Sequence, residues 1–176
     1  MNNKVYLYGG LNDQNEVLEN MEMFDAQTYK MSEVKYRLEV KAPGRQGHAA
    51  IAVSKFNMIV IGGTTDSTLI DPTPIDPRHQ IYSFDMEAST WHAKSSGRLG
   101  AGSEPAPWNL VYHSLFKVDT QNVGVLWYDT IESPSFQEEV KEAIAVSTRR
   151  VLRTSIYNMI TNTWRTIRIV DMDPNY

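Results

Sequence analysis

The four histidines are the first candidates for metal binding or acid–base chemistry, and they lie at His48, His79, His92 and His113. Histidines that bind a metal usually come in close pairs or beside cysteine, whereas these four are scattered and the chain has no Cys. The lack of Cys also rules out a disulfide framework, a thiolate metal site and a cysteine nucleophile. We therefore expect no metal site.

Two other patterns could carry chemistry. Residues 97–102 read Gly-Arg-Leu-Gly-Ala-Gly, but they lack the Gly-Lys-Ser/Thr ending of a phosphate loop and do not lead from a strand into a helix. Asp25 and Asp85 follow aromatic residues in a repeated phrase, and we expect their carboxylates to bond the backbone of a turn. The sequence predicts no catalytic residue and no cofactor, so we expect a protein that is not an enzyme.

That phrase occurs three times, at Phe24–Met31, Phe84–Trp91 and Tyr157–Trp164. Each copy has an aromatic residue, then Asp or Asn, and a large apolar residue six positions after the Asp or Asn. A repeated unit of this kind indicates that the chain is built from similar structural units.

Composition narrows the class of protein further. The 176 residues carry a net charge of −4, which disfavours sequence-independent binding to nucleic acid. The N-terminal residues lack the apolar run of a signal peptide, and no stretch approaches the roughly 20 apolar residues that cross a bilayer. We expect a cytoplasmic protein that binds neither nucleic acid nor membrane.

The elements between these motifs read as about eleven short strands separated by turn residues. The predicted strands are Lys4–Tyr8, Asn20–Phe24, Met31–Leu38, Gly47–Ser54, Met58–Ile61, Gln80–Phe84, Thr90–Lys94, Asn109–Val118, Val123–Tyr128, Val151–Tyr157 and Thr163–Val170. They fall into groups of four, and the first group begins at its second strand. A short helix is predicted over Glu138–Ala145, after a capping-box pattern at residues 135–138.

Double glycines end the second strand of two groups, at Gly9-Gly10 and Gly62-Gly63. The middle group also has Pro-x-Arg-x-x-His ahead of its first strand, with Arg45 and His48, then Phe84-Asp85 and Trp91. In this combination the chain resembles the kelch repeat, whose period is about 50 residues. The resemblance implies an all-β, kelch-type β-propeller segment of about three four-stranded antiparallel blades.

The blades would span residues 4–40, which is incomplete, then 43–95 and 107–171. The outer two depart from the pattern. Met31 replaces the Trp of the first blade, while Asn158 and Trp127-Tyr128 replace the Asp and the double glycine of the third. His113 stands fourteen positions before Trp127, as His48 does before Gly62, and Trp164 closes the third blade. Three blades cannot close a ring, so we expect the rest of the polypeptide or another copy to supply the others.

Strand order places the long connections on one face, which is the usual layout of a recognition surface. We therefore expect a protein–protein interaction module that acts as a scaffold or recruits a substrate. Its candidate partner-binding residues are Arg45, Arg78, His79, Arg98 and Trp108. Two alternatives stay open. One is a propeller enzyme that acts on a small molecule or sugar near the central axis, and the other is an architectural subunit of a large assembly.

Overall fold

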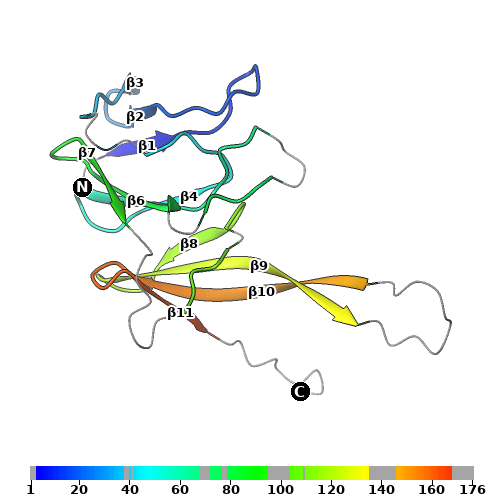
Figure 1. Cartoon of the computed structure of the whole chain (residues 1–176). Coiled ribbons are helices and arrows are strands. Elements are labelled where there is room, and N and C mark those ends of the chain that lie inside the picture. Colours follow the sequence, from blue (N-terminus) through cyan, green and yellow to red (C-terminus); the bar gives the residue numbers. More distant parts are fainter. Residues whose placement is uncertain are drawn as a thin grey trace.

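The computed structural model describes residues 3–37, 40, 42–67, 72–76, 79–94, 104–108, 110–134 and 146–167. These residues form three antiparallel sheets, and none of them is in an α-helix. Figure 1 shows the sheets one above another, with the first at the top and the third at the bottom. The expectation of an all-β chain is confirmed.

Each sheet is a meander, in which consecutive strands are neighbours. The first sheet has three strands and the other two have four. The strands are β1 (Lys4–Tyr8), β2 (Met21–Asp25) and β3 (Lys30–Glu33) in the first sheet; β4 (Ala49–Ala52), β5 (Asn57–Ile61), β6 (Ile81–Asp85) and β7 (Thr90–Lys94) in the second; and β8 (Ser114–Lys117), β9 (Asn122–Pro134), β10 (Val146–Asn158) and β11 (Thr163–Ile167) in the third.

Two of the predicted strands are shortened at the points where the chain leaves one sheet for the next. β3 ends at Glu33, and beyond it the N–H of Arg37 donates to the carbonyl of Ser89 in the second sheet. β8 begins at Ser114, since the residues before it bond the second sheet through Leu110 and Tyr112. At Arg37, Leu110 and Tyr112, backbone groups of the linking segments are thus satisfied across sheets instead of within one.

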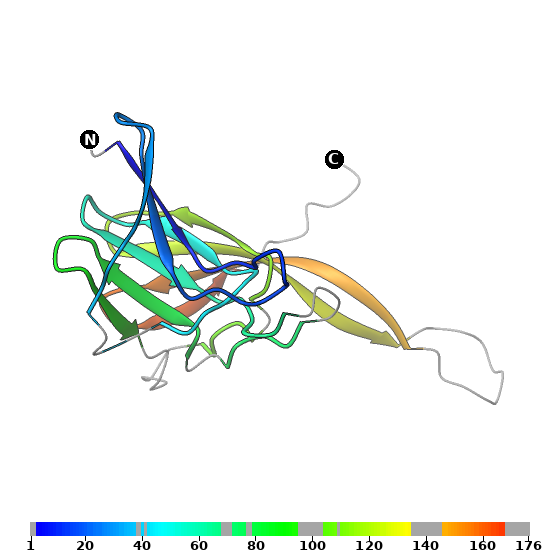
Figure 2. The same ribbon diagram turned by 90° about the horizontal axis from the view of Figure 1, so that it is seen from above.

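The third sheet differs most from the sequence-based expectation. The predicted strands in this region were Val123–Tyr128 and Val151–Tyr157, yet β9 and β10 continue their pairing as far as Pro134 and Val146. Figure 2 shows this two-stranded ribbon projecting beyond the rest of the molecule. The helix predicted over Glu138–Ala145 lies outside the described residues.

The middle sheet packs against a neighbouring sheet on each of its two faces. One face, with Met58, Val60 and Trp91, packs on Tyr8 and Met21 of the first sheet. The opposite face carries Ile59, Ile61 and Ile81 into a second cluster, together with Val123, Val125, Trp127, Tyr157 and Trp164 of the third sheet. Side chains alternate between the faces of a strand, so β5 must be apolar at consecutive positions, as it is. Nothing in the described part of the chain forms an apolar helix of bilayer-spanning length.

Candidate functional site

The contact between neighbouring sheets is made twice with the same residue types. The N–H of Gly10 donates to the carbonyl of Arg45 at 2.8 Å, and the N–H of Gly63 donates to the carbonyl of Leu110 at 2.6 Å. In both places the preceding glycine has a left-handed φ, 65° at Gly9 and 66° at Gly62. A Cβ at either position would overlap the same carbonyl oxygen, so only glycine permits this approach.

His48 and His113 lie at these two contacts. The Cε1 atom of His48 is 3.4 Å from the Cβ position of Gly9, and that of His113 is 2.7 Å from the Cβ position of Gly62. Burial lowers the pKa of each histidine to about 4, and the positive charge of Arg45 contributes at His48. Both imidazoles are therefore neutral near pH 7, which suits packing between sheets.

Arg45 lies inside the molecule and is 0% exposed. Its Nη1 donates to the carbonyls of Gly62 and Gln80, both at 3.0 Å, and its guanidinium lies 5.0 Å from the centre of the Tyr82 ring. These hydrogen bonds hold the loop before β4 against the second sheet, so Arg45, which was predicted as a partner-binding residue, is buried within the chain.

Trp91 and Trp164 occupy equivalent environments. Each is 2% exposed, and each packs on the aromatic residue paired with it across the strands. Ring centres are 4.9 Å apart for Phe84 and Trp91 and 5.1 Å apart for Tyr157 and Trp164. Both indoles face the preceding sheet, where they fill the space between two sheets.

Met31 holds the corresponding position in the first sheet but is 52% exposed. No described sheet covers this face, so Met31 does not pack between sheets in the described part of the chain as Trp91 and Trp164 do.

The repeated phrase forms the same turn three times, as expected for Asp25 and Asp85. Asp25 Oδ1 accepts from the N–H of Gln27 and Thr28, and Asp85 Oδ1 accepts from the N–H of Glu87 and Ala88. Asn158 Oδ1 accepts from the N–H groups two and three residues further on. These backbone donors hold the pKa of Asp25 and of Asp85 below the usual range, so both carboxylates are structural.

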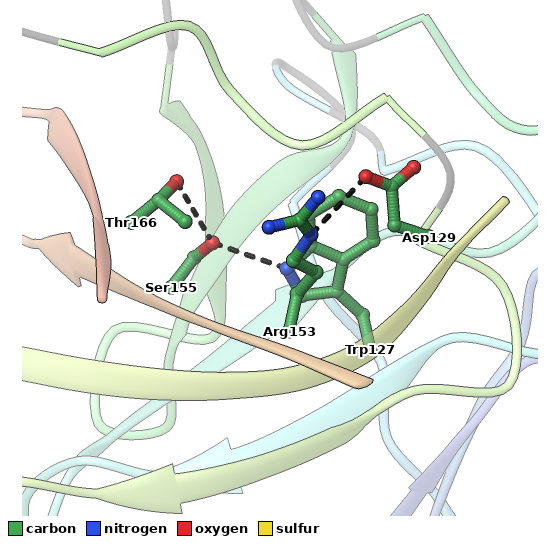
Figure 3. Close-up of polar contacts among 5 residues, drawn as sticks. All are labelled: Trp127, Asp129, Arg153, Ser155 and Thr166. Atoms are coloured by element: carbon green, nitrogen blue, oxygen red, sulfur yellow. Dashed lines mark hydrogen bonds and ion pairs between the residues drawn. The ribbon is translucent and has the colours of Figure 1, made fainter. Parts of the chain in front are cut away.

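A polar network takes the place of the double glycine in the third sheet (Figure 3). The indole Nε1 of Trp127 donates to Ser155 Oγ at 3.1 Å, and Ser155 Oγ lies 3.4 Å from Thr166 Oγ1. Nearby, Arg153 Nε donates to Asp129 Oδ2 at 3.2 Å. Ser155 and Arg153 were not predicted as site residues, although both lie on the Trp127 face once the register is known.

Two of the remaining candidate partner residues, His79 and Trp108, fall at the end of the sheets that carries the double glycines. Trp108 is 57% exposed and precedes β8, and His79 is exposed before β6. Arg78 and Arg98 lie outside the described residues. In Figure 1 the long connection after β1 and the far end of the β9–β10 ribbon lie on the same side of the molecule. The described residues contain no group of three or more His, Asp or Glu that could hold a metal ion.

The outer faces of the first and third sheets are exposed and partly apolar. On the first sheet this face carries Val5, Leu7 and Met31, with Glu22 opposite both Leu7 and Glu33. On the third sheet it carries Leu126, Tyr128, Leu152 and Ile167, together with Arg150 and Arg165. One face is therefore acidic and the other basic.

No protein-family model and no curated protein matches this chain.

Proposed function

We propose that this chain is a segment of a kelch-type β-propeller and serves as a protein–protein interaction module. The repeated inter-sheet contact supports the propeller, because the same glycine, carbonyl and histidine arrangement relates the first sheet to the second and the second to the third. A constant relation between successive sheets is what radial repetition of blades requires.

The observation that carries the interaction role is the grouping of long connections at the double-glycine end. Tight turns close the opposite end, where Asp25, Asp85 and Asn158 bond the backbone. Variable connections on a fixed scaffold form the usual binding face of such proteins. Trp108 is the best-placed anchor there, since a half-exposed indole offers a large contact area at low entropic cost.

Affinity capture with the full chain tests the role of this face. Trp108→Ala should remove the bound partners, because it truncates an exposed aromatic side chain at the proposed binding end. Tyr29→Ala is the matched control, since Tyr29 is also exposed but lies in the turn at the opposite end. Equal loss of partners in both variants, or retention in both, would reject this face as the binding surface.

An architectural role has its own support in the two outer faces. Their opposite charges and exposed apolar side chains suit packing against further sheets of the same kind. A subunit of this type would bury a large apolar area in its complex. Leu7→Lys combined with Leu126→Lys would then abolish assembly, whereas an interaction module that works through its loops would keep its partners.

A further inference from the structure

β1 has a free edge in the part of the chain that the structure describes, where it pairs with β2 alone. The carbonyl of Asn3 accepts from Ala26, and the N–H of Gly9 donates to Asn20. Hydrogen-bonding direction alternates along an antiparallel strand, so the backbone groups of Lys4 and Tyr6 point the other way. That edge therefore offers both donors and acceptors to an incoming strand.

The other two sheets show how such an edge is filled. β4 pairs with β5 at the equivalent edge, and the N–H of Val53 donates to the carbonyl of Asn57 at 2.9 Å. β8 pairs with β9 in the same way, with Val118 donating to Asn122 at 3.1 Å. Aligning the double glycines places Lys4 where Asn57 lies in β5. A strand at β1 would thus have the same register as β4 and β8.

A groove of about 600 Å³ lies between this edge and the second sheet. Lys4 and Tyr6 of β1 line one side, Ala50 and Ala52 of β4 line the other, and Met58 and Lys55 also contribute to the lining. Both alanines are exposed, whereas Leu115, the counterpart of Ala50 in β8, packs against the preceding sheet. Small side chains on β4 therefore leave room for a bulky residue.

We infer that this groove binds an extended segment of a partner protein, which adds a fourth strand to the first sheet. The segment has a large apolar residue opposite Tyr6, where the other sheets place Ile51 and Phe116. Two positions further on, opposite Lys4, it carries an Asp or Glu, because Lys4 and Lys55 both line the groove. Asp25 is paired with Lys4 across the strands, but backbone amides of its turn already bond its carboxylate.

Main-chain hydrogen bonds along the edge supply affinity in this mode, and alternate side chains in the groove supply specificity. The inference depends on β1, β4 and the neighbouring residues that line the groove, and its test does not require the chain to be part of a propeller.

Synthetic peptides provide the test, with the full chain as the receptor. The probe has the sequence of Gln46–Ser54 with Ile51→Phe and Val53→Asp, which places Phe opposite Tyr6 and Asp opposite Lys4. The matched control peptide carries Ile51→Ser and Val53→Lys instead. Calorimetry should give one probe bound per chain and at least about tenfold weaker binding of the control. Amide hydrogen exchange should slow at Lys4 and Tyr6.

Two receptor variants locate the site. Ala50→Glu places a charge in the groove at an exposed position and should weaken probe binding at least about tenfold. Ser114→Glu makes a similar change at an exposed position of β8 and should leave binding unchanged. Lys4→Glu should weaken the Ile51→Phe, Val53→Asp probe and favour a probe with Ile51→Phe and Val53→Lys.

Several results would overturn the inference. These are absence of binding at millimolar probe, equal loss of affinity in Ala50→Glu and Ser114→Glu, or protection of β4 or β8 amides in place of β1. Self-association that Ala50→Glu abolishes would also overturn it, because a second copy would then be the natural occupant. If the Trp108→Ala and Tyr29→Ala variants captured the same partners, the proposed binding face would fail, but peptide binding in the groove would be unchanged. Failure of one proposal is therefore distinguishable from failure of the other.

Discussion

Replacing Gly62 with Ala should destabilise the chain through two separable effects. Gly62 has a φ of 66°, where a Cβ costs about 1–2 kcal/mol. The added methyl would also overlap the Leu110 carbonyl oxygen and lie 2.7 Å from His113 Cε1. Overpacking of this kind costs about 1–3 kcal/mol, so we expect a total loss of about 2–5 kcal/mol.

Relaxation at this site is restricted. The Leu110 carbonyl also accepts from the N–H of Gly63 at 2.6 Å, so a movement that relieves the clash weakens the bond between the sheets. Gly10→Ala is the matched control, since Gly10 has a φ of 94° but nothing lies within 4 Å of its Cβ position. The Gly10→Ala variant should lose only the free energy that a Cβ costs at a positive φ, about 1–2 kcal/mol.

Urea denaturation of the two variants gives the comparison. We expect Gly62→Ala to lower the free energy of unfolding by at least about 1 kcal/mol more than Gly10→Ala does, because it adds the overlap. Equal losses would refute the reasoning, since they would show that the carbonyl of the next sheet does not approach Gly62.

Three further predictions concern the core, the histidines and the turns. Trp91→Ala and Trp164→Ala should each cost about 3–5 kcal/mol in urea denaturation, whereas Met31→Ala should stay within about 0.5 kcal/mol because Met31 is exposed; similar losses in all three variants would contradict the packing. The pKa of about 4 for His48 and His113 lies below the ordinary 6.5, so the unfolded chain binds more protons between these values. The stability that depends on the two neutral histidines should be fully present above about pH 6.5. As the pH drops from there towards 4, the free energy of unfolding should fall by about 1.4 kcal/mol per pH unit for each histidine. His113→Gln should reduce that slope in pH-dependent melting, and an unchanged slope would count against burial of the ring. Asp85→Asn should keep the stability of the turn while Asp85→Ala loses it, because Asn158 already serves in the third copy; equal melting temperatures for the two variants would contradict this.

Local patterns in the sequence predicted most of the fold. The repeated aromatic-Asp phrase predicted three turns and the strands beside them. The reason is that an Asp side chain accepts hydrogen bonds from backbone amides that begin only two residues further along the chain. The burial of Trp91 and Trp164 was also predictable, since large apolar residues recur there at equal spacing. Such features depend on short-range chemistry.

Features that depend on distant partners were missed. Arg45 carries a charge and is of a type that is usually exposed, and its burial depends on carbonyls at Gly62 and Gln80. The β9–β10 ribbon was not predicted beyond Tyr128, because its strand conformation depends on pairing between residues 129–134 and residues 146–151. Met31 fits the repeat but lacks a covering sheet among the described residues. The residues next to each of these positions in the sequence do not indicate whether the distant carbonyl, strand or sheet is present.

The repeated contact between sheets is tested most directly by NMR couplings across hydrogen bonds in the deuterated chain. A long-range HNCO experiment should connect the amide of Gly10 to the carbonyl carbon of Arg45, and the amide of Gly63 to that of Leu110. Both correlations, with slow amide exchange at the two glycines, are the predicted result. Fast exchange at both amides without either correlation would show that the sheets do not meet through these glycines.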